Sequence, residues 1–327
     1  MKQRRFILAI VVAISCWGVT QEIAMEQAAR PARWDGAHNV LFLGIGLYTK
    51  AGYAVRSYHD GAQRGADIDI FKDFPDAHTV LIEDAAASVA DRTIFAVVLN
   101  FGDRIRHVLL TYDSGGKLLQ ILDTEPYYVQ AVTTDDQGHI FTIANRLDEK
   151  PGNADPYPLL CEYDNGGSII AEALTSKIFV NGSRAINPGR EPGNAVLMLK
   201  DGKFFLYAPF ESEFVMFSKD GTILKRARLY NLLHKIAKDG GLNEVVVRNL
   251  VFIDENRIAL DLNGHIDKDQ PSVPSTVIVN INTMQYKRVI GKDVRDWRLF
   301  GSADGHLLTI GKDKDKVVFR KHELDAH

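Results

Sequence analysis

Short runs of β-branched and aromatic residues, in which hydrophobic and polar positions alternate, fill most of the chain. Turns rich in Gly, Asp and Asn separate these runs, and long stretches with helical periodicity are nearly absent. This pattern is typical of an all-β sandwich, barrel or propeller. One exception is the segment 229–241, whose apolar spacing and closing glycines predict a short amphipathic helix.

Two recurring sequence units favour one of these folds. In the first unit a strand ends in a polar turn with glycine and a second strand follows, as in residues 107–121 and 159–170. In the second unit an acidic turn leads into an apolar strand, as in residues 135–144 and 200–207. Asp and Asn bond to the backbone in such turns, and Gly supplies a positive φ. Because a sandwich has no reason to repeat this pair of units, the pattern favours a propeller.

The spacing of the first unit predicts how many times it repeats. Its central residues are separated by 54, 51, 54, 62 and 40 positions: Tyr58, Tyr112, Tyr163, Phe217, Val279 and Phe319. Six units of about 50 residues predict a six-bladed β-propeller with four-stranded antiparallel blades over residues 30–327. The first unit lacks an obvious innermost strand and the last stops after its third. We therefore expect the N- and C-terminal segments to share a blade and close the ring, with residues around 20–35 supplying an edge strand.

Together the two units resemble the six-bladed propellers of the NHL-repeat and related bacterial superfamily. The resemblance is carried by Asp-x-x-Gly-x-Ile-aromatic followed by aromatic-Asp-x-x-Gly-x-Ile/Leu, and it covers roughly residues 39–327. These motif residues form turns and pack neighbouring blades. The resemblance therefore implies an architecture and leaves the function open.

The first 29 residues have a different character. A basic start precedes the uncharged run 6–19, which is shorter than the roughly 20 residues of a bilayer span, so residues 1–29 predict a secretory signal. Residues 13–15 before Cys16 resemble a lipoprotein box. Conventional cleavage, lipidation of Cys16 and an uncleaved anchor remain alternatives. We expect an exported protein, periplasmic or extracellular, with its N-terminus as the site of any membrane tether.

Charge and cysteine content narrow the partners. Lys and Arg number 39 against 42 Asp and Glu, and the net charge of −3 becomes −6 without the three basic signal residues, which disfavours nucleic acid. Cys161 is the one cysteine of the mature part, so it cannot form an intrachain disulfide, and its strand context predicts a buried packing role. We expect a monomer that binds a small molecule or an envelope protein.

In this architecture small ligands bind at the channel mouth, on loops entering the innermost strands and on loops joining the second and third strands. Two long insertions, 147–156 and 264–274, fall in the second class and hence on one face. This mapping predicts a loop-rich binding face with aromatic, amide and guanidinium groups: Tyr127, Tyr128, Asn145, Arg146, Arg184, Arg190, Arg248, Asn249 and Arg295. Such donors suit a carboxylate, a phosphate or a sugar acid. The alternative is that these side chains bridge loops and cap turns.

A divalent-metal hydrolase or lactonase is the alternative function. Gluconolactonase- and paraoxonase-like propellers hold a cation in the channel through Glu, Asn and Asp of different blades. That resemblance implies Ca²⁺ ligands here at Glu83, Asn100, Asn249 and Asp296, with Asn145 and Asn263 as further candidates. The chain has no His-x-His or His-x₃-His pair and no Gly-x-Ser-x-Gly elbow. We therefore expect first a non-catalytic binding protein with no cofactor.

Overall fold

The computed structural model describes most of the chain beyond the N-terminal segment. The described residues are 32–49, 52–59, 62–147, 157–179, 195–209, 211–266, 273–290, 298–303, 305–313 and 316–323. The signal segment 1–29 with Cys16 lies outside them, as do Arg184, Arg190, Arg295 and Asp296. Within the described ranges, no helix is both long and apolar enough to cross a membrane.

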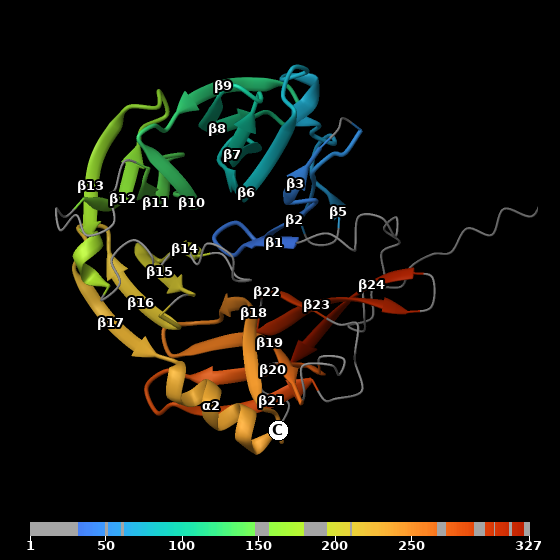
Figure 1. Cartoon of the computed structure of the whole chain (residues 1–327), viewed down its shortest axis with the longest axis vertical. Coiled ribbons are helices and arrows are strands. Elements are labelled where there is room, and N and C mark those ends of the chain that lie inside the picture. The colour runs from blue at the N-terminus through green and yellow to red at the C-terminus, as the bar shows by residue number, and fades with distance from the viewer. Residues whose placement is uncertain are drawn as a thin grey trace, which may run out of the picture.

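Six antiparallel sheets account for the strands in these ranges (Figure 1). The first holds β1 (Ala32–Asp35), β2 (Val40–Leu43), β4 (Arg56–His59) and β5 (Ala62–Gln63). The second has the order β3 (Gly46–Tyr48), β6 (Thr79–Ser88), β7 (Arg92–Asn100), β8 (Ile105–Tyr112) and β9 (Leu118–Asp123). The third holds β10 (Tyr127–Thr134), β11 (Ile140–Arg146), β12 (Pro158–Tyr163) and β13 (Ile169–Thr175).

The remaining three sheets follow in chain order. The fourth holds β14 (Val196–Lys200), β15 (Lys203–Ala208), β16 (Glu213–Ser218) and β17 (Ile223–Arg228), and the fifth holds β18 (Glu244–Phe252), β19 (Arg257–His265), β20 (Val273–Asn280) and β21 (Gln285–Ile290). The sixth holds β22 (Arg298–Ala303), β23 (His306–Asp313) and β24 (Lys316–Glu323). The described helices are η1 (Ile70–Lys72), η2 (Ser176–Ile178) and α2 (Tyr230–Asp239), and α2 confirms the predicted amphipathic helix.

The acidic turns form as the sequence predicts. In the turn from β10 to β11, Asp135 Oδ1 accepts the backbone N–H groups of Gln137 and His139, each at 2.9 Å. Gly138 completes this turn with a φ of +85°, a conformation that favours glycine. The same side-chain capping recurs at Asp113 and Asp164, so this turn chemistry is a property of the repeated unit.

The repeat found in the sequence corresponds to equivalent places in the sheets. In five sheets the aligned position falls on the third strand, and in the second sheet, where β3 precedes β6, it falls on the fourth: Tyr58 on β4, Tyr112 on β8, Tyr163 on β12, Phe217 on β16, Val279 on β20 and Phe319 on β24. In Figure 1 the sheets follow one another around the middle of the molecule, with β6, β10, β14 and β22 near the centre. The fold is thus all-β, with several four-stranded antiparallel sheets, and it is consistent with a propeller.

The described part of the segment expected to supply an edge strand begins the first sheet. Residues 32–35, part of the segment expected to close the ring, form β1, which pairs with β2 as the first strand of the first sheet. Residues 20–31 lie outside the described ranges. β1 also contacts β6 and β22, so the first sheet lies beside both the second and the sixth.

Aromatic side chains pack neighbouring sheets together. Phe141 and Phe204 join the third and fourth sheets at a centroid distance of 5.0 Å, and Trp34 and Phe300 join the first and sixth at 5.8 Å. A Cβ on Gly301 would lie 2.6 Å from the Trp34 ring, so the absence of a side chain there allows β1 to approach β22. Cys161 is buried and unpaired, as predicted, and burial raises its pKa to about 12.

Candidate functional site

The structure brings some of the predicted site residues together. Tyr127 and Tyr128 begin β10 and lie directly opposite Arg146 and Asn145 at the end of β11. The Tyr128 hydroxyl donates a hydrogen bond to Glu83 of the neighbouring sheet. The ligand-binding and metal-binding predictions therefore meet at one place, between β6 and β10.

This cluster is a closed polar contact between two sheets. Burial raises the pKa of the Glu83 carboxyl, although the Tyr128 hydrogen bond opposes this effect, and burial likewise raises the pKa of Tyr128. The ring of His107 lies 5.1 Å from that of Tyr128, and burial lowers the His107 pKa. Because these groups already contact one another and are largely buried, they hold β6 against β10.

Other predicted residues are likewise engaged within the protein. Arg248 Nη2 contacts Asp261 Oδ1 at 2.6 Å on the paired strand. Asn249 donates through Nδ2 to the Leu299 carbonyl of the next sheet at 3.0 Å, and its Oδ1 accepts the N–H of Leu250 at 2.9 Å. Asn100 Oδ1 accepts the Gly102 N–H at 2.7 Å. The amide oxygens of both asparagines, predicted as Ca²⁺ ligands, thus already accept a hydrogen bond from the backbone.

β-Bulges explain the orientation of several of these side chains. The pairing register shifts at Glu83 in β6, at Gln130 in β10 and at Arg248 in β18. A bulge re-aims a side chain at a strand position where regular alternation would place it on the other face. Gln130 is buried and was missed, because alternation in the sequence carries no sign of a bulge.

A second missed group lies at the centre of the sheets. Arg33 of β1 forms an ion pair with Asp84 of β6, and Asp84 Oδ2 also accepts the Val132 N–H of β10 at 2.8 Å. Burial raises the Asp84 pKa to about 6, whereas the Arg33 charge lowers it. The pair therefore connects the first three sheets. The sequence does carry a signal for such a pair: Asp84 lies in an apolar run, and an acid that is buried there needs a partner.

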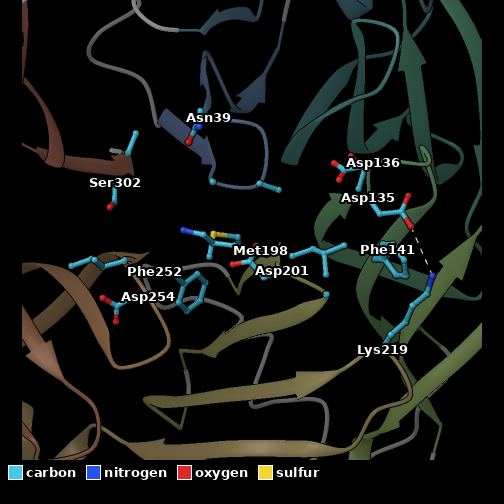
Figure 2. Close-up of a pocket in the computed structure, with 18 of the residues that line it drawn as sticks. Asn39, Asp135, Asp136, Phe141, Met198, Asp201, Lys219, Phe252, Asp254 and Ser302 are labelled. Atoms are coloured by element: carbon cyan, nitrogen blue, oxygen red, sulfur yellow. Dashed lines mark ion pairs between the residues drawn. The ribbon is translucent and has the colours of Figure 1, made fainter. Parts of the chain in front are cut away.

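A cavity of about 690 Å³ opens at the opposite end of the innermost strands (Figure 2). Most of its lining comes from the turns that lead from the first to the second strand in five of the sheets: residues 36, 37, 39, 134–137, 198–202, 252–254, 257, 302, 303 and 305. Tyr128 and Asp135 are seven residues apart along β10, roughly 23 Å at the rise of a β-strand. The cavity is therefore distinct from the predicted loop-rich face.

The cavity is lined by four aspartates and by several apolar side chains. Asp135 lies near Lys219 Nζ at 3.8 Å, and Asp254 is paired with Arg257 at 2.8 Å. Asp136 and Asp201 are exposed and have no ion-pair partner among the described residues. Met198, Phe252 and Ile253 line the same space. Figure 2 shows the labelled carboxylates from different turns around it.

A histidine connects the cavity wall to neighbouring sheets. His38 Nδ1 lies 2.9 Å from Asp35 Oδ2, which also accepts the Ala87 N–H at 2.8 Å. His38 Nε2 lies 3.5 Å from Thr134 Oγ1. Burial and the Arg64 charge lower the His38 pKa, but the hydrogen bond to Asp35 and the charges of Asp35 and Asp136 outweigh these effects, so the pKa is raised overall.

Comparisons with known proteins inform the fold alone. No protein-family model matches the chain, and no curated protein matches it. The chain is similar to the solved structure of a proposed exported protein from Bacteroides fragilis, with 8% identity over 94% of both chains and a TM-score of 0.52. It is also similar to the GH74 xyloglucanase of Xanthomonas campestris, with 10% identity and a TM-score of 0.50, over 94% of this chain and 46% of that one.

A third similar structure is a nidogen/laminin complex, with 11% identity, 86% of this chain and 89% of that chain covered, and a TM-score of 0.46. At these identities the two likenesses with TM-scores of at least 0.50 support the all-β fold alone, which is consistent with a propeller. Membership of the NHL-repeat superfamily stays a prediction, because the comparisons identify no family.

Proposed function

We propose that the protein is a six-bladed propeller whose ring closes where β1 meets β22. The contacts of β1 with both β6 and β22, and the packing of Trp34 over Gly301, support this closure. Gly301→Val is expected to cost about 1–3 kcal/mol of unfolding free energy by overpacking this contact. Gly115→Val in the turn after β8 serves as a control, because Gly115 does not adopt a positive φ and its Cβ position meets only the Asp113 side chain, at 3.3 Å. An equal or smaller loss at Gly301 would contradict closure at this contact.

We further propose that the protein is exported and binds a small organic cation, without catalysis, in the cavity at the turns. The observation that carries this proposal is the pair of exposed carboxylates, Asp136 and Asp201, which project from neighbouring turns and have no ion-pair partner in the described ranges. The cavity volume of about 690 Å³ is in the range of small-molecule sites.

The balance of charge favours an amine as the ligand. Of the three basic residues that line the cavity, Lys219 and Arg257 already contact acids, which leaves Lys200 against two available carboxylates. An alkylammonium ligand places its charge on these carboxylates and its methylene groups on Met198 and Phe252. An exposed ion pair contributes up to about 1 kcal/mol, so removal of both carboxylates is expected to weaken binding about tenfold.

The chemistry of the lining also favours binding over catalysis. His38 lies behind the lining and contacts Asp35, and the described residues that line the cavity include neither a histidine nor a cysteine, the groups best suited to proton transfer or nucleophilic attack near neutral pH. The predicted signal in residues 1–29 places the cavity in the periplasm or outside the cell. The loop-rich face remains a second candidate surface for a protein partner.

Calorimetric titration with spermidine tests the binding function. The wild-type protein is expected to bind spermidine, and Asp136→Asn with Asp201→Asn to weaken binding about tenfold. The matched control is Asp76→Asn with Asp103→Asn, which makes the same charge change on exposed residues near the other end of the sheets. Glucose and glutarate serve as neutral and anionic comparison ligands. Preferential binding of either, or equal losses in both double variants, would contradict the proposal.

A further inference from the structure

A second group of side chains at the cavity rim is independent of the two available carboxylates. Asp135 Oδ2, His139 Nδ1 and Glu162 Oε1 all lie within 4.8 Å of one another. His139 Nδ1 is 3.3 Å from the Asp135 oxygen and 3.1 Å from the Glu162 oxygen. No other such group of His, Cys, Asp and Glu residues occurs in the described part of the chain.

The backbone places these three groups together. His139 immediately precedes β11, and Phe141 two residues later lies directly opposite Glu162 on β12. Residues two apart on a strand share a face, and so do directly opposite residues, so His139 and Glu162 project from one face. The turn that Asp135 caps through Oδ1 brings its Oδ2 to the same place. These Oδ1 contacts fix the orientation of the carboxylate, as outer contacts do around metal ligands.

The distances fit a metal better than they fit hydrogen bonds. Ligand atoms around a tetrahedral Zn²⁺, with bonds of about 2.0–2.1 Å, are separated by about 3.3 Å. A charged hydrogen bond between nitrogen and oxygen is about 2.7–2.9 Å long. His139 Nδ1 is itself inaccessible to solvent and makes no hydrogen bond of acceptable geometry, although two carboxylates flank it. An imidazole with two carboxylates is a donor set that Zn²⁺ accepts.

The ammonium group of a lysine lies at the edge of this group of side chains. Lys219, from the turn between β16 and β17, places Nζ 2.6 Å from Glu162 Oε1 and 3.8 Å from Asp135 Oδ2. Glu162 is nearly buried, whereas the Lys219 side chain is about half exposed. The carboxylates therefore hold a positive charge whose carrier can move into solvent and leave its place to another cation.

We propose that Asp135, His139 and Glu162 form a binding site for a divalent transition-metal ion of the Zn²⁺ type. The metal displaces the Lys219 ammonium, and water completes its coordination. Lys219 belongs to the fourth sheet and the three ligands belong to the third. Metal binding therefore removes the ion pairs between the two sheets and forms bonds within the third sheet. The site lies at the rim of the cavity and does not depend on any ligand within it.

Zn²⁺ titration of the untagged protein tests this site, with Co²⁺ absorption as a report on nitrogen and oxygen coordination. The wild-type protein is expected to bind one Zn²⁺, and His139→Gln and Glu162→Gln each to weaken binding by at least tenfold. Lys219→Met is expected to tighten binding, because the competing ammonium is gone. The matched controls are His234→Gln on α2 and Glu172→Gln on β13, both exposed and outside the group.

The outcomes separate clearly. Binding that persists in both His139→Gln and Glu162→Gln would overturn the proposal, as would Lys219→Met weakening it or no binding by the wild-type protein. If Lys219→Met alone bound Zn²⁺, the lysine would hold the site closed and the proposal for the natural chain would be wrong. Melting curves identify a variant that fails to fold. If Glu162→Gln fails to fold, His139→Gln still tests the site, because the His139 side chain is partly exposed.

Discussion

Acidic residues in the interior of the sheets differ from those in the turns that form the cavity. Asp84, Asp261 and Glu213 are nearly inaccessible, and each is paired with an arginine. Asp136 and Asp201 lie in turns, are exposed and have no such partner among the described residues. A buried charge must find its counter-ion within the protein, whereas a charge at a turn is stabilised by water until a ligand replaces it. Asp84, Asp261 and Glu213 thus serve stability, and Asp136 and Asp201 are available for binding.

Removal of the cation from an interior pair should have the largest effect on stability. Arg33→Met leaves Asp84 buried without its partner, and we expect the unfolding free energy to fall by about 3–5 kcal/mol in urea titrations. Arg106→Met breaks the ion pair to Asp123 at 2.8 Å on the surface, where the expected loss is about 0–1 kcal/mol. Similar losses in the two variants would remove the distinction between interior and surface acids.

Addition of Asp84→Asn to Arg33→Met separates charge from packing. If an unpaired carboxylate causes the loss, the double variant should recover part of the stability of the single variant. No recovery would assign the effect to the shape of the arginine side chain.

Loss of a neutral contact between sheets should have a smaller effect. Asn249→Ala removes the hydrogen bond to the Leu299 carbonyl, and we expect a loss of about 1–2 kcal/mol in the same titration. Asn282→Ala on the surface is the control, with a change within about 0.5 kcal/mol. If Asn249→Ala lost no more than the control, the contact between β18 and β22 would not contribute to stability.

Much of the fold could be predicted, because its signals are local. The turn residues Asp135 and Gly138 recur with their strands, and the helix at 230–239 has its own period and stop. Contacts between distant positions could not be predicted in this way. Arg33 and Asp84 are 51 residues apart, and nothing in either segment identifies the other.

The cavity escaped prediction for a different reason. The sequence predicts only a structural role for the acidic turns, and Asp135 does cap the backbone of its own turn. The sequence around Asp136 and Asp201 shows only that they lie in such turns and gives no sign that they line a cavity. Whether such residues meet depends on how the sheets follow one another around the centre, which no single repeat encodes.

The pH dependence of stability should distinguish His38 at the cavity wall. Its folded-state pKa is raised above 6.5, so its contribution is fully present below that value and is lost as the pH rises through the folded pKa. We expect the wild-type melting temperature to fall from pH 5.5 to 8 by more than that of His38→Gln. Equal slopes for the two proteins, or a steeper slope for the variant, would contradict this role of the contact with Asp35.

The smallest expected effect on stability belongs to the cavity acids. Asp136→Asn with Asp201→Asn breaks no ion pair among the described residues, so the unfolding free energy should change by no more than about 0.5 kcal/mol per site. A loss comparable to that of Asn249→Ala would mean that these acids serve the fold.

The most direct test is the shift in melting temperature that spermidine produces in two variants measured side by side. A ligand that binds only the folded state stabilises it by RT ln(1 + [L]/Kd), so the melting temperature rises as the ligand concentration exceeds Kd. Asn249→Ala should melt lower than the wild-type protein and keep the full spermidine shift. Asp136→Asn with Asp201→Asn should melt near the wild-type temperature and lose the shift. A preserved shift in the cavity variant, or its loss in Asn249→Ala, would contradict the assignment of turn acids to binding and interior groups to stability.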